Sequence, residues 1–394
     1  MTSEWSTIRA ADFIDFNPRL SLKKGAIATK VAMDKLKPFT KKIPETEKAE
    51  FNGGAKFCNG DTVMARITPC LENGKTAYVD MLDDGEIGFG STEFIVMRAK
   101  TGISDPQFVY YTAINPVFRN VAIKSMVGSS GRQRVQQSVL EELELSVPDL
   151  DEQGRIGDFL ARIDEKIALN DRINDNLEQQ AQSYFQELFV DNADPEWAIG
   201  TISDLGTIVG GSTPSKAKPE YYTESGIAWI TPKDLSINKS KFVSHGENDI
   251  TELGLKNSSA AIMPEGTVLF SSRAPIGYIA IAAGEVTTNQ GFKSVVPKPE
   301  IGTPFVYFFL KNTLPVIEGM ASGSTFKEVS GSTMKNVPAV IPDAETLAKF
   351  SDFCAPIFAQ QRILEEQNQS LATLRDNLLP KLMSGEIDVS AVQL

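Results

Sequence analysis

The sequence predicts an α+β chain with an internal pseudo-two-fold repeat, in which two β-rich domains are separated by two long antiparallel coiled-coil helices. Three observations predict this fold. The 394 residues repeat with a period of about 194, each half opens with short β-branched runs, and each half closes on a long apolar stripe of helical period. A period of this length corresponds to a whole domain plus a helix rather than to a solenoid unit.

The repeat is clearest toward the end of each half. The matched positions, first half before second, are Pro148 and Pro342, Asp149 and Asp343, Gly128 and Gly323, Leu177 and Leu371, and Leu188 and Leu382. We therefore expect a tandem duplication. Its predicted parts are domain 1 over 1–148, a first long helix over 149–190, domain 2 over 191–342, a second long helix over 343–384 and a C-terminal tail over 385–394.

The β-rich part of each half consists of short runs bounded by Gly, Asn and Asp. Strands are expected at 62–67, 76–79 and 93–97 in the first half, and at 267–270, 278–281 and 294–296 in the second. A helix is expected to follow each set, over Pro106–Asn115 and Thr303–Lys311. A proline near the start of each suits the first helical turn.

The two long helices are predicted by apolar residues that recur every three or four positions. Asp149 with Glu152 has the form of an N-terminal capping box, and Asp343 is the expected cap of the second helix. Roughly 35–40 residues give a rod of about 50–60 Å. A long helix with one apolar stripe needs a partner, and two copies joined by a whole domain pair most simply antiparallel.

Polar residues interrupt both apolar stripes at matching points. They are Asn170 and Asn174 in the first helix, and Gln361 and Asn368 in the second. Buried amides in a coiled coil can fix its register. The alternative is that these side chains face solvent or another subunit.

Composition excludes several classes of protein. The chain contains no run of about 18 apolar residues, so no transmembrane helix is expected, and its start lacks the pattern of a secretory signal. Cys58, Cys70 and Cys354 are far apart and odd in number, which fits reduced thiols and a cytoplasmic location. With His245 as the single histidine, a zinc site is not expected.

The net charge of −12 argues at first against binding to nucleic acid. Most of it lies in the helical segments, however: residues 150–196 carry −8 and residues 344–394 carry −3, whereas residues 1–149 are neutral. Because affinity for DNA depends on local patches, either β-rich domain could still present a basic face.

The duplicated β-rich half, the strand that ends in proline and the long helix together resemble the specificity subunit of type I restriction–modification systems. Short stretches that add to the resemblance are LLPKLMSGEI (378–387), GGSTPSK (210–216), WITPKDL (229–235), FNPR (16–19), KKG (23–25), GSTEF (90–94) and TNQGFK (288–293). The resemblance covers nearly the whole chain. The duplication and the helix ends are specific, and each short motif is weak alone.

This resemblance implies a non-catalytic subunit that binds double-stranded DNA at an asymmetric bipartite target. It also implies two methyltransferase partner subunits and, in the full nuclease, endonuclease subunits. Such complexes methylate adenine or cleave at a distance, with S-adenosylmethionine, ATP and Mg²⁺ bound by the partners and no cofactor bound by this chain. Two domains about 50–60 Å apart would contact blocks separated by roughly fifteen base pairs.

Base recognition needs Arg, Lys, Asn or Gln on loops that reach a groove. The candidates in the first half are Lys23, Lys24, Arg66, Ser91, Thr92, Arg132, Gln133, Arg134 and Gln136. Those in the second half are Ser212, Thr213, Lys216, Lys233, Arg273, Asn289, Gln290, Lys293, Ser324, Thr325 and Lys327. The alternatives are a solvated connector for 128–137, structural salt bridges for the arginines, and solvated surface lysines. Trp229 is expected in the core.

No catalytic constellation emerges from the sequence. Asn115-Pro116-Val117-Phe118 is similar to the tetrapeptide of amino-methyltransferases but lacks its second proline, so a helix end is the simpler account. A phosphate-binding loop and the Glu-x-Lys of metal-dependent nucleases are also absent. Two alternatives stay open: the recognition portion of a fused restriction–modification enzyme, and a coiled-coil scaffold that does not bind DNA.

Overall fold

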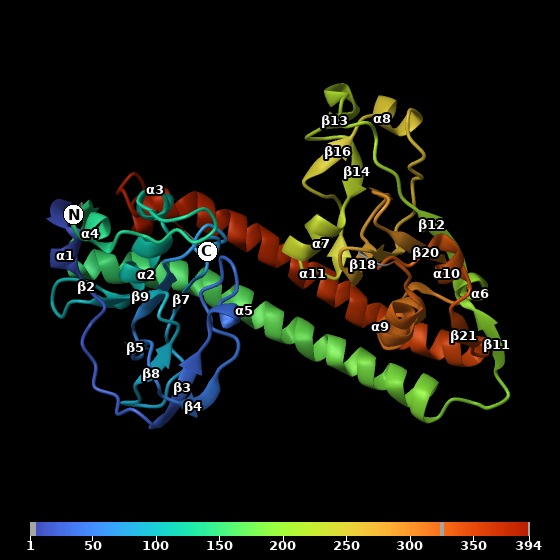
Figure 1. Cartoon of the computed structure of the whole chain (residues 1–394), viewed down its shortest axis with the longest axis horizontal. Coiled ribbons are helices and arrows are strands. Elements are labelled where there is room, and N and C mark those ends of the chain that lie inside the picture. Colours follow the sequence, from blue (N-terminus) through green and yellow to red (C-terminus); the bar gives the residue numbers. More distant parts are fainter. Residues whose placement is uncertain (1–4, 324–326, 393–394) are drawn as a thin grey trace. The chain divides into compact units, whose positions relative to one another are not determined.

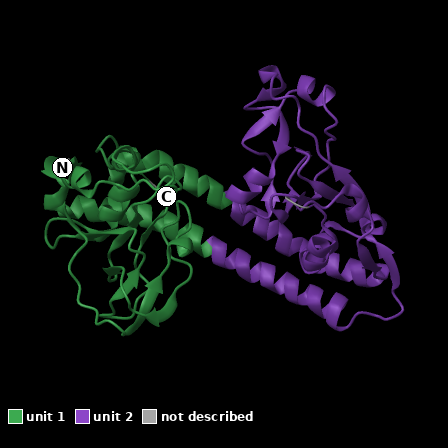
Figure 2. Ribbon diagram, in the orientation of Figure 1, with its two compact units in different colours: residues 1–169, 367–394 green, residues 170–366 purple. Residues whose placement is uncertain are grey.

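The computed structural model describes residues 5–323 and 327–392. The chain divides into two compact units: unit 1 comprises residues 1–169 and 367–394, and unit 2 comprises residues 170–366 (Figure 2). Each unit therefore contains one β-rich domain together with a segment of each long helix. Two of the predicted contact residues, Ser324 and Thr325, lie outside the described residues.

Unit 1 is built around two four-stranded sheets, of order β2-β9-β6-β7 and β4-β3-β8-β5, and the antiparallel pair β1-β10 (Figure 1). The strand bounds are β1 Ser6–Arg9, β2 Ile14–Phe16, β3 Ile27–Val31, β4 Glu47–Glu50, β5 Ala55–Phe57, β6 Thr62–Ala65, β7 Thr76–Tyr78, β8 Gly88–Gly90, β9 Phe94–Ala99 and β10 Glu144–Val147. The short helices are α1 Ala10–Phe13, α2 Pro106–Ile114, α3 Pro116–Lys124 and α4 Gln137–Glu141.

Unit 2 contains sheets of order β12-β20-β17-β18-β15 and β13-β16-β14-β19, and the antiparallel pair β11-β21. The strand bounds are β11 Ala198–Thr201, β12 Gly206–Gly210, β13 Tyr222–Thr223, β14 Ile227–Ile230, β15 Phe242–Val243, β16 Asn248–Ile250, β17 Val268–Ser272, β18 Ile276–Ala282, β19 Thr287–Thr288, β20 Lys293–Pro297 and β21 Pro338–Ile341. The helices of the domain are α6 Ile202–Leu205, α7 Pro232–Ile237, α8 Glu252–Lys256, α9 Thr303–Met320 and α10 Gly331–Lys335.

The two units share one topology, which confirms the predicted duplication. The order β2-β9-β6-β7 recurs as β12-β20-β17-β18, and the parallel pair β3·β8 recurs as the parallel pair β14·β19. The closing pair β1·β10 recurs as β11·β21. Gly128 and Gly323, which the sequence matches, both have positive φ, 136° and 127°.

Most predicted elements are confirmed, but one boundary is wrong. The six expected strands correspond to β6, β7, β9, β17, β18 and β20, and the first predicted short helix is α2. The second, expected to end at Lys311, is α9 and continues to Met320 with Pro315 inside it. The apolar face of α9 continues beyond the expected end, since Ile317 is fully buried in the core of unit 2, and tertiary packing overrides the proline.

The long helices are α5 (Leu150–Gln186) and α11 (Ala344–Leu382). The Asp149 side chain accepts the Glu152 N–H at 2.9 Å, and Asp343 accepts the Thr346 N–H at 2.9 Å, so both predicted caps are confirmed. Within each unit the two helix segments run antiparallel. In unit 1 Asp164 pairs with Arg375 at 2.6 Å, and in unit 2 the rings of Tyr184 and Phe353 lie 4.5 Å apart.

The amides in the apolar stripes are partly buried in this pairing. Asn170 and Gln361 are buried, and Gln361 donates to the Asn174 carbonyl at 3.2 Å. The alternative that these side chains face solvent is therefore wrong for Asn170 and Gln361. Asn368 is half-buried.

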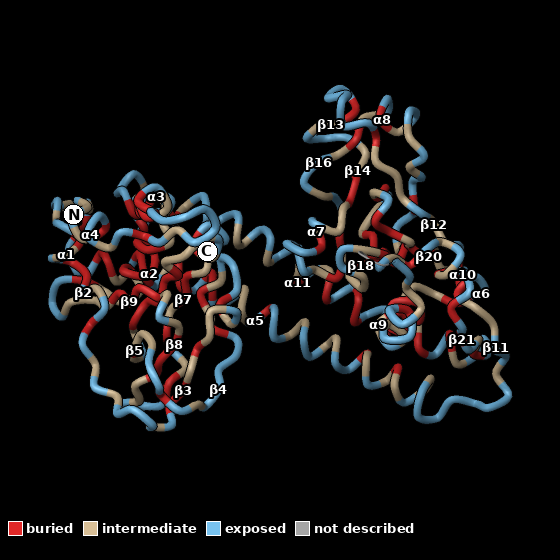
Figure 3. Tube along the Cα trace, in the orientation of Figure 1, coloured by how far each residue is buried: buried red, intermediate tan, exposed pale blue. Residues whose placement is uncertain are grey.

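The largest buried cluster of each unit forms where its domain meets the long helices, and a smaller one lies within the domain. In unit 1 one cluster joins β2, β6, β9 and α2 to Leu160 of α5 and Leu379 of α11. In unit 2 a cluster joins β17, β18, β20 and α9 to Phe185 of α5 and Phe350 of α11, whereas α8 is mostly exposed (Figure 3). Within the described residues, none of the helices combines the length and apolar content that a membrane span requires.

Candidate nucleic-acid interface

An open hollow of about 610 Å³ lies in unit 1 where four separate segments of the chain meet, and we call it hollow 1. Its lining residues are Asn17, Pro18, Arg19, Leu20, Gly54, Ala55, Lys56, Arg66, Thr92, Phe94 and Val96. They come from the end of β2, the start of β5, the end of β6 and the start of β9. The sequence-predicted contacts Arg66 and Thr92 therefore meet here.

Unit 2 carries an open hollow of about 490 Å³, which we call hollow 2. Its lining residues are Thr213, Lys216, Trp229, Thr231, Pro232, Lys233, Glu247, Asn248, Arg273, Ala274, Asn289, Gln290 and Gly291. Six of the predicted contacts are among them: Thr213, Lys216, Lys233, Arg273, Asn289 and Gln290. Thr213 and Gln290 are joined by a hydrogen bond across the hollow.

The two hollows occupy equivalent places in the repeated topology. Each is lined by the loop that follows β2 or β12, the loop that precedes β9 or β20, and the segment that follows β6 or β17. In unit 2 the loop after β12 and the loop before β20 lie close together, because a Cβ added at Gly211 would lie 2.1 Å from the Asn289 carbonyl oxygen. Glycine alone permits this approach.

Both hollows have more basic than acidic side chains. Hollow 1 is lined by Arg19, Lys56 and Arg66 and, among its described lining residues, by no carboxylate. The Arg66 guanidinium donates through Nη2 to the Val135 carbonyl at 3.2 Å, while its buried Nε has no hydrogen-bond partner among the described residues. Such guanidinium groups in a concave site suit phosphates and the acceptor edge of guanine.

Hollow 2 has a different arrangement of charge. Lys233 pairs with Glu247 at 2.6 Å, and Arg273 lies 3.5 Å from Glu328. The amide-bearing Asn289 and Gln290 form its other wall, and the Asn289 side chain accepts the Gly291 N–H at 2.8 Å. Each hollow thus combines arginine with amide side chains, Arg66 and Asn17 in hollow 1 and Arg273, Asn289 and Gln290 in hollow 2, and these are the side chains that bond to guanine and adenine edges.

Arg66 and Arg273 line the two hollows from positions that differ by one residue. The Val135 N–H donates to the Arg66 carbonyl, and the equivalent Val329 N–H donates to the Ser272 carbonyl. Ser272 is therefore the counterpart of Arg66, and Arg273 lies one residue further along. A register irregularity in β17 between Phe270 and Ser272 accompanies this shift.

The predicted basic loop of unit 1 is partly engaged within the protein. Arg134 forms a bidentate pair with Glu93, at 2.6 and 2.9 Å, and this pairing lowers the pKa of Glu93 below its usual range. Gln136 donates to the Ser125 carbonyl at 3.0 Å, and the Gln133 backbone carbonyl accepts the Thr68 N–H. Arg132 is exposed at the tip of the loop.

The other predicted contacts lie outside the hollows. Lys23 and Lys24 are exposed in the turn before β3, and Ser91 accepts the Glu93 N–H next to hollow 1. Ser212 is bonded to Trp229 through its carbonyl, and Lys327 is exposed. Lys293 is half-buried and 3.7 Å from Glu328.

Several lining residues were missed by reasoning from the sequence. Arg19 belongs to a stretch that carries the family resemblance, so this stretch could have identified it. Lys56, Asn248 and Glu247 have no such signal, because their positions beside the hollows depend on strand pairing. Trp229 is buried as predicted, and it also forms part of the wall of hollow 2.

Comparisons with known proteins agree with this architecture. The specificity subunit of the type I restriction enzyme MjaIX from Methanocaldococcus jannaschii is 38% identical over 194 residues, which are 47% of this chain and 45% of that one. The specificity subunit of the HindI enzyme from Haemophilus influenzae is 25% identical over 407 residues, covering 83% of this chain and 86% of that one. The match thus spans about half of the MjaIX subunit and most of the HindI subunit.

A solved structure shows the same fold. The crystal structure of the type I restriction–modification S subunit from M. genitalium superposes with a TM-score of 0.59 at 17% identity, covering 96% of each chain. In addition, the family model for the type I restriction modification DNA specificity domain matches residues 3–179 and 195–374. Since these two matches take in both repeats and nearly the whole chain, the protein belongs to the type I restriction–modification DNA specificity family.

Proposed function

We propose that each unit contacts one block of an asymmetric, bipartite target on double-stranded DNA, with hollow 1 and hollow 2 as the two contact sites. The observation that carries this proposal is the presence of two hollows at equivalent places in the repeat, each lined by basic and amide side chains. Because the lining residues differ, the two blocks should differ in sequence.

The division of labour within each site follows from side-chain chemistry. Exposed Lys24, Arg132, Lys216 and Lys327 suit phosphate contacts, which position the protein on the duplex without distinguishing sequences. Arg66 in hollow 1, and Asn289 and Gln290 in hollow 2, suit contacts with base edges.

The chain on this proposal is the non-catalytic subunit of a larger complex. Two methyltransferase subunits and, in the full nuclease, endonuclease subunits supply the chemistry and bind S-adenosylmethionine, ATP and Mg²⁺. The acidic segment 150–196, with net charge −8, is the natural docking surface for them. The alternatives are the recognition portion of a fused restriction–modification enzyme and a scaffold that does not bind DNA.

Co-expression with a cognate methyltransferase, followed by methylome sequencing, tests the proposal. We expect one new bipartite methylated motif, and we expect replacement of residues 1–147 by those of another family member to change one block only. A scaffold would add no motif. A fused enzyme would be recognised by the adjoining coding sequence and by co-purification of a single longer polypeptide.

A single variant tests hollow 1. Arg66→Gln should relax recognition at one position of one block, with a loss of about 1–3 kcal/mol in discrimination between bases. Lys30→Gln is the matched control, because Lys30 lies on β3 and pairs with Glu47 at 2.7 Å, outside the lining of hollow 1. Methylation rates on duplexes that differ at single positions give the result, and equal effects of the two variants would contradict the assignment.

A further inference from the structure

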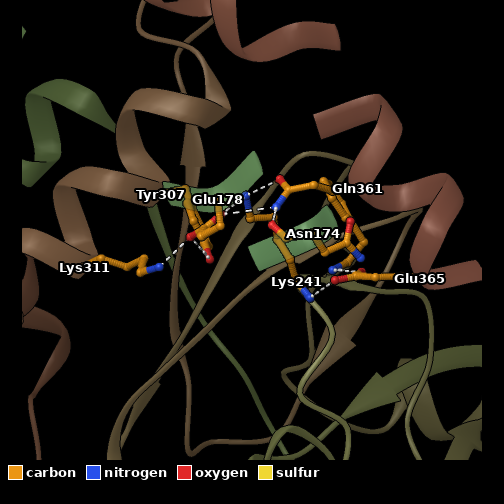
Figure 4. Close-up of polar contacts among 8 residues, drawn as sticks. Asn174, Glu178, Lys241, Tyr307, Lys311, Gln361 and Glu365 are labelled. Carbon is orange, nitrogen blue, oxygen red and sulfur yellow. Dashed lines mark hydrogen bonds and ion pairs between the residues drawn. The ribbon is translucent and has the colours of Figure 1, made fainter. Parts of the chain in front are cut away.

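A buried lysine connects the β-rich domain of unit 2 to both long helices. Lys241 follows α7, and its Nζ lies 2.5 Å from Glu178 Oε2 on α5 and 2.7 Å from Gln361 Oε1 on α11 (Figure 4). The ammonium group also lies 3.9 Å from the centroid of the Phe358 ring. Three elements that are distant in the sequence therefore meet at one side chain.

The Glu178 carboxylate is the hydrogen-bond acceptor at the centre of this cluster. It accepts hydrogen bonds from the ammonium groups of Lys241 and of Lys311 on α9, and from the Tyr307 hydroxyl at 3.2 Å (Figure 4). Burial alone would raise the pKa of Glu178, but the two ammonium groups lower it below its usual range. The carboxylate is thus ionised, and its hydrogen bonds from the two ammonium groups are of the strong, charge-assisted kind.

A second contact holds the backbone next to Lys241. The Glu365 carboxylate of α11 accepts the N–H of Lys241 at 2.7 Å and the N–H of Phe242 at 3.0 Å. Phe242 begins β15, the edge strand of the five-stranded sheet, and Lys241 directly precedes it. The neighbouring strand β18 donates its Ile281 N–H to the Lys241 carbonyl at 2.7 Å. The chain at 241–242 is therefore fixed to α11 and to the sheet together.

The short helix α7 lies in the chain between hollow 2 and Lys241. The start of α7 supplies Thr231, Pro232 and Lys233 to the lining of the hollow, and Lys241 follows the end of the same helix. Asp234 of α7 also accepts the Glu247 N–H at 2.9 Å, so this helix holds a further lining residue in place. A displacement at Lys241 would be passed on to one wall of hollow 2.

We propose that Lys241 is a positioning residue for recognition of the second DNA block: it holds α7, and with it one wall of hollow 2, at a set position on α5 and α11. This inference rests on the proposed function of hollow 2. It deepens that function by naming a residue that affects specificity without lying at the hollow.

The equivalent lysine of unit 1 has a different environment. The Lys41 carbonyl accepts the Tyr78 N–H of β7, as the Lys241 carbonyl accepts from β18. Its Nζ, however, lies 3.3 Å from the Tyr111 hydroxyl, and it is this hydroxyl that donates to Asp164 of α5 at 2.6 Å. Lys41 Nζ also donates to Gln107 of α2, so its hydrogen bonds go to α2, and Tyr111 carries the link onward to Asp164. The neighbours of Lys41 in sequence are not among the described lining residues of hollow 1.

The test compares Lys241→Met with Lys311→Met in the complex with the cognate methyltransferase. Both variants remove one ammonium group from Glu178, but Lys311 belongs to α9 and not to the segment that leads to hollow 2. Methylation rates are measured on the target and on duplexes mismatched in either block, and melting temperatures are measured in parallel.

We expect Lys241→Met to lower the ratio of matched to mismatched rates about tenfold for the second block and to leave the first-block ratio unchanged. Lys311→Met should lower the melting temperature and change neither ratio. A fall in melting temperature without a change in the second-block ratio, or an equal change in both ratios, would overturn the proposal. A wild-type complex that does not discriminate at the second block would instead contradict the proposed function.

If Lys241→Met gives no folded complex, Glu365→Gln decides the matter. This variant leaves the Lys241–Glu178 pair in place and removes one of the two carboxylate oxygens that accept the backbone N–H groups. A lower second-block ratio supports the proposal, and an unchanged ratio refutes it.

Discussion

Arg134 and Glu328 occupy equivalent backbone positions, but they carry opposite charges. Arg134 bridges to Val127 and Glu328 bridges to Ser322, each beside the glycine that the repeat matches. Arg134 pairs with Glu93, whereas Glu328 lies near Arg273 and Lys293. In unit 1 a basic residue at this position pairs with an acidic neighbour, and in unit 2 an acidic residue at the same position pairs with basic neighbours.

This pairing leads to a prediction for the loop of unit 1. Arg132→Ala should weaken DNA binding by removing one exposed cation. Arg134→Ala should weaken it more, because it also leaves the Glu93 carboxylate unneutralised next to Thr92 of hollow 1. Affinity titrations at several salt concentrations measure both effects, with a salt slope lower by about one for each lost phosphate contact. A larger effect of Arg132→Ala would contradict this ranking.

Lys41 leads us to expect a free energy of unfolding that depends on pH. Burial lowers the pKa of Lys41 from its ordinary value of 10.5 to about 8 in the folded chain. Between these pH values the unfolded chain binds more protons than the folded chain, so this group makes the free energy of unfolding rise as pH rises from about 8. We expect Lys41→Met to remove that rise, as measured by denaturant unfolding from pH 7 to 10. Parallel curves for both proteins would show that Lys41 does not titrate in this range.

At the level of secondary-structure elements, the contact between α5 and α11 in unit 1 includes a buried ion pair as well as apolar packing. Arg375 and Asp164 are both buried and lie 2.6 Å apart, and Tyr111 donates to the same carboxylate. Arg375→Ala should lower the free energy of unfolding by about 3–5 kcal/mol, because it leaves a buried charge unpaired.

Two controls accompany the Arg375 variant. The double variant Asp164→Leu with Arg375→Met should recover most of the loss, because it removes both charges and keeps apolar volume. Lys381→Ala, which removes one partner of the exposed Lys381–Glu386 pair at the end of α11, should change the free energy of unfolding by less than about 1 kcal/mol. Equal losses for Lys381→Ala and Arg375→Ala would mean that burial does not decide the strength of the pair.

At the scale of the whole molecule, net charge and DNA binding are separate properties. The chain carries −12, yet the described lining of hollow 1 has three basic side chains and no acidic one. With about four phosphate contacts, the Kd for DNA should rise about a hundredfold between 50 and 200 mM salt. Binding that is independent of salt would indicate that the hollows do not contact the phosphate backbone.

Sequence patterns were sufficient to predict the duplicated architecture, the caps and antiparallel pairing of α5 and α11, and the strands β6, β7, β9, β17, β18 and β20. These features depend on periodicity and on residues close together in the chain, such as Asp149 and Glu152. The sequence also identified the family, because the repeat and the helix ends are specific.

Which side chains meet at the hollows depends on the packing of segments that are distant in the sequence. Lys56 reaches hollow 1 because β5 and β9 belong to sheets that come together there, and Arg273 is offset from Arg66 through an irregularity in β17. The Lys241–Glu178 contact joins residues 63 positions apart in the sequence, and nothing in the local pattern marks Lys241 as buried. Burial and pairing depend on how distant segments pack, and local sequence carries too little of that information to predict them.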